Sequence, residues 1–161
     1  MFNRIASSGV SWLGLSVLIL LGDRLSKDWV LAHLIPGEPL KIFPFLNFTL
    51  VHNTGAAFGF LHTAAGWQNL FLGSLAVMVS AAILIWLTRL SVRQICLGMA
   101  LGLVLGGALA NVWDRVLYGY VVDFLSFHLG EWYFAIFNVA DSAICVGALM
   151  LMIDWLRQPK P

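Results

Sequence analysis

Two acidic residues, Asp123 and Asp141, lie in strongly apolar parts of the sequence. A charge close to hydrocarbon is costly, so ionisable residues in such surroundings indicate a functional site. If the fold brings the two carboxylates together, they can share one proton, because two like charges at close range resist ionising together. Such a pair can activate water, with one member accepting a proton while the other polarises a scissile carbonyl. The same acids could equally bind a cation or relay protons, and their spacing alone does not decide between these roles.

Further polar residues are spaced to share helix faces. Asn111, Asp114 and Arg115 fall at positions i, i+3 and i+4, and Asp23 and Lys27 are four residues apart. Arg115 keeps its proton, so we expect it to orient or balance carboxylates rather than to transfer protons. The Asp23 and Lys27 pair has two interpretations. Lys27 either extends to lipid headgroups at a helix end, or its face points toward the polar residues of other segments.

Other kinds of catalytic site lack their characteristic residues. The sequence has no G-x-S-x-G or H-E-x-x-H motif and no glycine-rich phosphate loop. The histidines are scattered without the i, i+4 spacing of a metal-binding helix: His33, His52, His62 and His128. We therefore expect neither a metal nor another cofactor. Cys96 and Cys145 lie in apolar runs and are predicted to be buried, unreactive thiols.

The composition is typical of a membrane protein. Of the 161 residues, 60% are hydrophobic and 11% charged, whereas soluble domains have about 25% charged residues. A span needs roughly 20 residues. We therefore predict one integral, all-α membrane domain over 1–161, with spans at about 11–34, 67–87, 95–115 and 134–156. The first span lacks a small-x-small cleavage site and is expected to be retained. A net charge of +1 without a basic run argues against a nucleic-acid partner.

The segments between spans, about 35–66 and 116–133, are expected to be extracytoplasmic. Prolines and glycines break helix after residue 35, and 46–54 has the alternating, β-branched pattern of one or two short strands. In the third span Gly98, Gly102 and Gly106 form a ridge of small residues that lets a neighbouring helix approach closely. The positive-inside rule places both termini in the cytoplasm, because one side carries more basic residues outside the polar motifs: Arg4, Arg89, Arg93, Arg157 and Lys160.

Taken together, five motifs resemble those of the bacterial lipoprotein signal peptidases (signal peptidase II), in the same order along nearly the whole chain. They are Asp23-x-x-x-Lys27, Asn53-x-Gly55-x-Ala57-Phe58-Gly59, Gly106-Gly107-Ala108-x-x-Asn111-x-x-Asp114-Arg115, Val121-Val122-Asp123-Phe124 and Phe137-Asn138-x-Ala140-Asp141. Ala110 departs from the pattern, since the family usually has glycine just before the asparagine. The resemblance implies four transmembrane helices with a small extracytoplasmic β platform and a flap loop over the site, at 54–62.

The resemblance also implies the activity and the site. Asp123 and Asp141 would be the catalytic dyad of an aspartic endopeptidase that needs no cofactor. The remaining family positions would hold the dyad and the substrate or support them: Asp23, Lys27, Asn53, Gly55, Asn111, Asp114, Arg115 and Asn138.

The substrates implied by the resemblance are diacylglyceryl prolipoproteins, cleaved just before the lipidated cysteine. The enzyme would lie among the lipids of the bacterial inner membrane, act as a monomer and be inhibited by cyclic peptides of the globomycin type. Two other classes remain as alternatives. A proton- or cation-coupled carrier would use the same acids as a relay, although the two halves show no inverted repeat. A purely structural membrane subunit would leave the polar residues without a role.

Overall fold

The computed structural model describes residues 8–55 and 67–157. Four helices are long and apolar enough to cross a membrane: α2 (Leu13–His33, extended at its start by the 3-10 turn η1, Gly9–Trp12), α3 (Trp67–Arg89), α4 (Ile95–Tyr118) and α5 (Val139–Arg157). A small antiparallel sheet has the strand order β1 (Pro39–Phe43), β2 (Leu46–Asn53), β3 (Val121–Leu129) and β4 (Trp132–Tyr133). The predicted fold class, four membrane helices with a small β platform, is confirmed.

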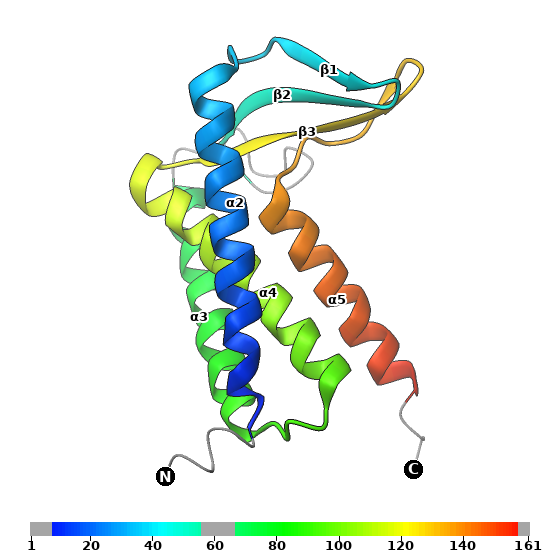
Figure 1. Ribbon diagram of the computed structural model, residues 1–161. Helices are drawn as coiled ribbons and strands as arrows, with labels where there is room; N and C mark the ends of the chain where they lie inside the picture. Colours follow the sequence, from blue (N-terminus) through cyan, green and yellow to red (C-terminus); the bar gives the residue numbers. More distant parts are fainter. Residues whose placement is uncertain (1–7, 56–66, 158–161) are drawn as a thin grey trace.

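The sheet covers one end of the helices, as Figure 1 shows. The start of α2, the end of α5 and the connection between α3 and α4 lie together at the opposite end. Below the sheet, α4 is the central helix and packs against the other three. Polar residues near the sheet end of α2, α4 and α5 therefore share one region of the molecule.

The glycine ridge of α4 allows the close approach that its spacing predicted. A Cβ at Gly106 would lie 2.7 Å from the backbone oxygen of Ser16 on α2, and Gly98 leaves no room for a Cβ beside the Trp12 ring. On the other side of α4, Gly107 lies against the backbone oxygen of Ala140 on α5. These contacts hold α2 and α5 on either side of α4 at backbone distance.

The strand that carries Asp123 is fixed by what lies before and after it. Helix α4 ends at Tyr118 and is capped by Gly119, whose φ of 77° is a left-handed conformation that glycine adopts without strain. Val121 to Phe124 are then buried at the start of β3, with Val122 and Phe124 packed against Val30 and Leu50. The packing of its apolar neighbours and the pairing of its strand thus fix the position of Asp123.

Helix α5 begins at Val139, later than the expected span start near residue 134. The preceding segment instead pairs with β3. Phe137 accepts the backbone N–H groups of Phe124 and Leu125, at 3.0 and 2.7 Å, and donates its own to Leu125 at 3.1 Å. This pairing places the first turn of α5 directly beside β3.

The prediction that both cysteines are buried was wrong. Cys96 and Cys145 are both exposed free thiols. A weakly polar thiol is accommodated there, because lipid is as apolar as a protein interior and an apolar run need not turn inward.

Candidate active site

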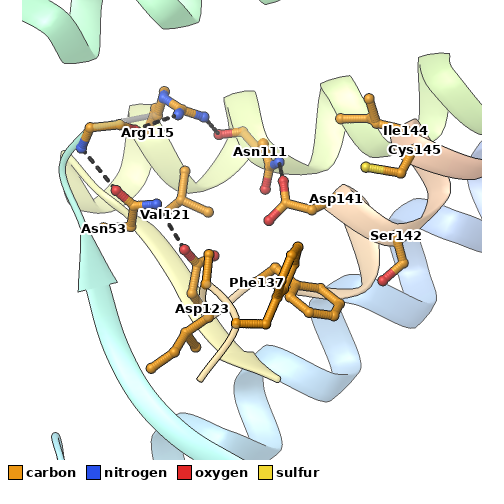
Figure 2. A pocket seen from close by; sticks show the side chains of 14 residues that line it. Asn53, Asn111, Arg115, Val121, Asp123, Phe137, Asp141, Ser142, Ile144 and Cys145 are labelled. Carbon is orange, nitrogen blue, oxygen red and sulfur yellow. Dashed lines mark hydrogen bonds between the residues drawn. The ribbon is translucent and has the colours of Figure 1, made fainter. Parts of the chain in front are cut away.

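A cavity of about 460 Å³ lies where β2, β3, α4 and α5 meet. Asp123 and Asp141 both line it, although 18 positions separate them in the sequence (141 − 123). Figure 2 shows the two carboxylates together with Asn53, Asn111 and Arg115 around the same space. The fold thus brings the two predicted acids to a common site.

Asp123 receives one amide donor on each carboxylate oxygen. Asn53 Nδ2 donates to Oδ2 at 2.8 Å, and Asn138 Nδ2 donates to Oδ1 at 2.7 Å. The side chain is almost fully buried. Burial raises the pKa of Asp123 to about 7, with a further contribution from the negative charge of Asp141, while the two amide donors act in the opposite direction. Asp123 therefore exchanges its proton near neutral pH.

Asp141 is held in the first turn of α5 by a reciprocal cap. Asn138 Oδ1 accepts the backbone N–H of Asp141 at 2.8 Å, and Asp141 Oδ2 accepts the backbone N–H of Asn138 at 3.3 Å. This is the capping-box arrangement, with an aspartate in the position that glutamate or glutamine usually occupies. The other carboxylate oxygen accepts Asn111 Nδ2 at 2.8 Å. A negative charge at this end of the helix is also favoured by the helix dipole.

Asn138 connects the two acids. It is fully buried, and its side-chain amide donates to Asp123 while its backbone N–H and side-chain oxygen hold Asp141. Asn138 lies three residues before Asp141, just before the first residue of α5, and acts as the cap of that helix. In that position a single asparagine reaches both carboxylates.

Arg115 contacts the chain around the acids rather than the acids themselves. Its guanidinium donates to the backbone oxygens of Asn111 and Gly55, each at 3.3 Å. Asn53 Oδ1 in turn accepts the Gly55 N–H at 2.9 Å, forming a turn stabilised by its side chain. The positive charge of Arg115 still interacts favourably with both aspartates through space. Arg115 thus balances charge and anchors Gly55.

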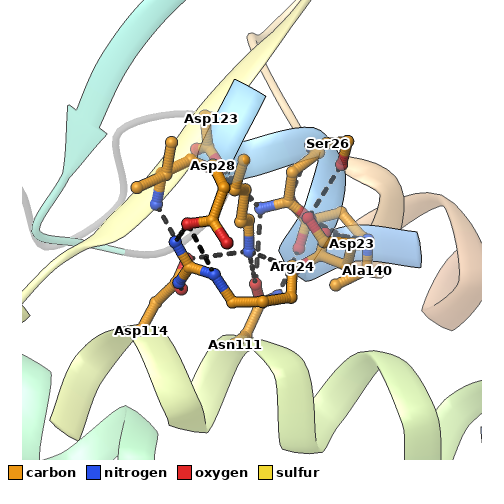
Figure 3. A network of polar contacts seen from close by, with 12 residues as sticks. Asp23, Arg24, Ser26, Asp28, Asn111, Asp114, Asp123 and Ala140 are labelled. Carbon is orange, nitrogen blue, oxygen red and sulfur yellow. Dashed lines mark hydrogen bonds and ion pairs between the residues drawn. The ribbon is translucent and has the colours of Figure 1, made fainter. Parts of the chain in front are cut away.

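The face of α2 that carries Asp23 and Lys27 points inward, which decides between its two interpretations. Lys27 is fully buried, and its Nζ lies 2.6 Å from Asp23, 2.8 Å from Asp114 and 3.2 Å from Asn111 Oδ1. A lysine that extends to headgroups would be exposed. Figure 3 shows this cluster between α2 and α4.

Sequence reasoning gave no role in the site to Arg24 and Asp28. Arg24 forms ion pairs with Asp28 and, at 3.2 Å, with Asp114, and its guanidinium lies 5.5 Å from the centre of the Tyr118 ring. The four-residue spacing of Arg24 and Asp28 was the available signal. Of the predicted flap, Thr54 and Gly55 are described, and 56–62 lies outside the described residues.

The rest of the cavity wall is mainly apolar. Phe134, Phe137, Ile144 and Cys145 contribute to it on the side of α5. The three described histidines instead stack on aromatic rings, His33 on Trp29, His52 on Tyr120 and His128 on Tyr133. An apolar cavity with one buried carboxylate, Asp123, and one half-buried carboxylate, Asp141, is suited to an apolar substrate that must meet water at one bond.

Known proteins with related sequences and structures agree on a family. The profile of the family described as Signal peptidase (SPase) II matches residues 15–157. A lipoprotein signal peptidase of Coxiella burnetii is 51% identical over 160 residues, which cover 99% of this chain and 98% of the relative. One of Yersinia enterocolitica is 40% identical over 159 residues, with 99% and 94% covered.

Two solved structures of bacterial membrane enzymes also share the fold. They have TM-scores of 0.81 and 0.82 at 27% and 26% sequence identity. The first alignment covers 94% of this chain and 93% of the solved one. On this evidence the chain belongs to the signal peptidase II family, whose members are peptidases of the aspartic type.

Proposed function

We propose that this protein removes the signal peptide from diacylglyceryl-modified prolipoproteins by cleaving just before the lipidated cysteine, with Asp123 and Asp141 as its catalytic dyad. The observation that carries the proposal is the meeting of the two acids in one cavity, each with amide donors on both carboxylate oxygens. The relatives named above are lipoprotein signal peptidases, which supports the substrate class.

In the proposed mechanism the dyad carries a single proton. The ionised aspartate accepts a proton from water as the water oxygen attacks the scissile carbonyl carbon, and the protonated aspartate gives its proton to the carbonyl oxygen. The resulting diol collapses when the protonated carboxyl gives its proton to the leaving nitrogen, the other aspartate accepts a proton from a diol hydroxyl and the C–N bond breaks. The new carboxyl group and amine depart, and the dyad again holds one proton. A pKa of about 7 for Asp123 suits this cycle at neutral pH.

The cavity also suits the proposed substrate. Its wall is mainly apolar, and the β3 strand and the start of α5, which carry the two acids, lie at the end of the helices that the sheet covers. A substrate with a signal helix and two acyl chains could enter from the lipid, since each buried CH₂ contributes roughly 0.8 kcal/mol before ordering costs. We propose that the protein acts as a monomer and a single integral membrane domain. Both termini would lie in the cytoplasm, with the site near the extracytoplasmic face.

The test uses purified protein in detergent with one prolipoprotein, with and without its diacylglyceryl group. We expect cleavage only of the lipidated form, at the bond before the modified cysteine, and inhibition by globomycin. Asp123→Asn and Asp141→Asn should each abolish cleavage, because neither variant can complete the proton cycle. Mass spectrometry of the products identifies the bond.

The matched control is Asp154→Asn, which removes a carboxylate near the opposite end of α5. It should cleave at the wild-type rate. Substantial turnover by a folded Asp123→Asn or Asp141→Asn protein would refute the dyad. If folded wild-type protein leaves the lipidated substrate intact, the proposed reaction is wrong. Proton flux into liposomes that depends on Asp123 would then support the carrier.

A further inference from the structure

Two carboxylates outside the dyad hold the backbone immediately before each acid of the dyad. Asp23 Oδ1 accepts the N–H of Ala140 at 2.8 Å, and Ala140 precedes Asp141. Asp114 Oδ2 accepts the N–H of Val122 at 3.1 Å, and Val122 precedes Asp123. The acceptors come from α2 and α4, whereas the donors lie on α5 and β3. Each acid is thus anchored through the backbone N–H of the residue that precedes it.

Lys27 joins the two anchors. Its Nζ contacts Asp23 Oδ2 and Asp114 Oδ2, and it also donates to Asn111 Oδ1 at 3.2 Å. Asn111 in turn donates to Asp141. One buried ammonium group therefore touches three side chains, each of which contacts a residue of the dyad or its neighbouring backbone.

The charge of Lys27 matters because the anchors are buried carboxylates. Asp23 and Asp114 are each about 1% exposed, and removing the partner of a buried ion typically costs several kcal/mol. Asp114 has a second cationic partner in Arg24, whereas Lys27 is the one ion-pair partner of Asp23 among the described residues. Loss of Lys27 would therefore affect the Asp23 anchor most.

We propose that Lys27 is a positioning residue: its charge keeps Asp23 and Asp114 aimed at the amides of Ala140 and Val122 and thereby sets how Asp141 and Asp123 face each other. The proposal rests on the proposed function of the dyad. Small displacements matter in such a site, since misplacing a reacting group by 1 Å can lower a rate by about 100-fold.

The acceptor role is tested with two double variants that are both neutral at positions 23 and 27. Lys27→Met with Asp23→Asn retains an oxygen that can accept the Ala140 N–H, whereas Lys27→Met with Asp23→Leu does not. Asparagine and leucine have the same number of side-chain heavy atoms as aspartate and the same branching, so the two proteins differ mainly in this acceptor. Steady-state cleavage of the lipidated prolipoprotein gives kcat and KM separately for each.

We expect the Asp23→Asn double variant to keep kcat within about tenfold of wild type, the scale of a weakened hydrogen bond. The Asp23→Leu double variant should lose about 100-fold in kcat, with KM close to that of wild type because the apolar cavity is unchanged. Equal kcat values in the two double variants would overturn the anchoring role. Such a result would leave the dyad intact, provided that Asp123→Asn is inactive.

The charge role is tested by Lys27→Met alone. Because this single variant leaves Asp23 without its cation, it should be less active and less thermostable than the same variant with Asp23→Asn added. If adding Asp23→Asn fails to restore activity, the charge-balancing role is wrong. Ser16→Ala provides the stability control, since Ser16 is buried on the same helix, donates to Gly102 at 2.8 Å and lies 11 residues from Lys27. It should lower the melting temperature without changing kcat.

If the Asp23→Leu double variant fails to fold in the membrane, the same comparison is made at the other anchor. Lys27→Met with Asp114→Asn retains an acceptor for Val122, and Lys27→Met with Asp114→Leu removes it. The expected order of kcat is the same, and equal values would again refute the proposal.

Discussion

Asp123 should make the folded protein less stable as the pH rises from about 4 to about 7. Its pKa is 3.8 in an unperturbed chain and about 7 in the folded protein. Between these values the unfolded state has already released the proton that the folded state retains. The folded state therefore binds more protons in this window, and the free energy of unfolding falls with rising pH. Below the lower value and above the upper one, this contribution is constant.

The magnitude follows from the size of the shift. A change of about 3 pH units, from 3.8 to about 7, corresponds to about 4 kcal/mol at about 1.4 kcal/mol per unit. Most of it is the cost of an ionised carboxylate in a buried site, because the side chain is only 2% exposed. An enzyme that keeps an acid poised for catalysis near neutral pH thus accepts a lower stability there.

The assay is thermal unfolding in detergent between pH 4.5 and 8, followed by tryptophan fluorescence. Wild type and Asp123→Asn are compared at each pH, so that other titrating groups largely cancel. We expect the stability of Asp123→Asn relative to wild type to rise by about 3 kcal/mol between pH 4.5 and 8, because part of the full change lies below pH 4.5, and Asp154→Asn to show no such rise. Parallel stability curves for wild type and Asp123→Asn would refute a raised pKa at Asp123.

Two further perturbations follow from the packing and charge around the site. Gly107→Ala should lower the free energy of unfolding by about 1–3 kcal/mol and reduce cleavage, because the new Cβ would collide with the Ala140 backbone at the start of α5. Gly14→Ala is the matched control, because a Cβ at Gly14 would meet no neighbouring segment within 4 Å. Equal melting temperatures of the two variants would contradict the prediction. Arg115→Ala should raise the pKa of Asp123 further and move the basic limb of the pH–rate profile upward, because it removes a positive charge that interacts with this carboxylate. The control is Arg89→Ala, at the end of α3 far from the sheet, which should leave the pH–rate profile unchanged. If the basic limb of the pH–rate profile does not shift in Arg115→Ala, the charge-balancing role of Arg115 is contradicted.

Much of the fold could be predicted because it depends on local sequence. Long apolar runs indicate spans wherever the chain meets lipid, and a four-residue glycine spacing places small side chains on one helix face. The alternating pattern of 46–54 likewise predicted strand β2. Strand β1 was not predicted, because its side chains are exposed along its length and the segment carries no alternating burial signal.

The composition of the site could be predicted, but its connections could not. Asp114 and Arg115 are adjacent in α4, yet Asp114 pairs with Lys27 while Arg115 reaches Gly55. That division depends on which helices lie on either side of α4, and no local pattern contains it. The same holds for the backbone amides of Val122 and Ala140, which have no side-chain signature.

Residues close together in the chain are enough to indicate the four spans, strand β2 and the two carboxylates in apolar surroundings. Contacts between distant segments decide that Cys96 is exposed, that Lys27 is buried and that Asn138 caps α5 while holding Asp123. The physical reason is that lipid and protein interior are equally apolar, so hydrophobicity does not separate the inward from the outward face of a span. Only the contacts between distant segments can do so.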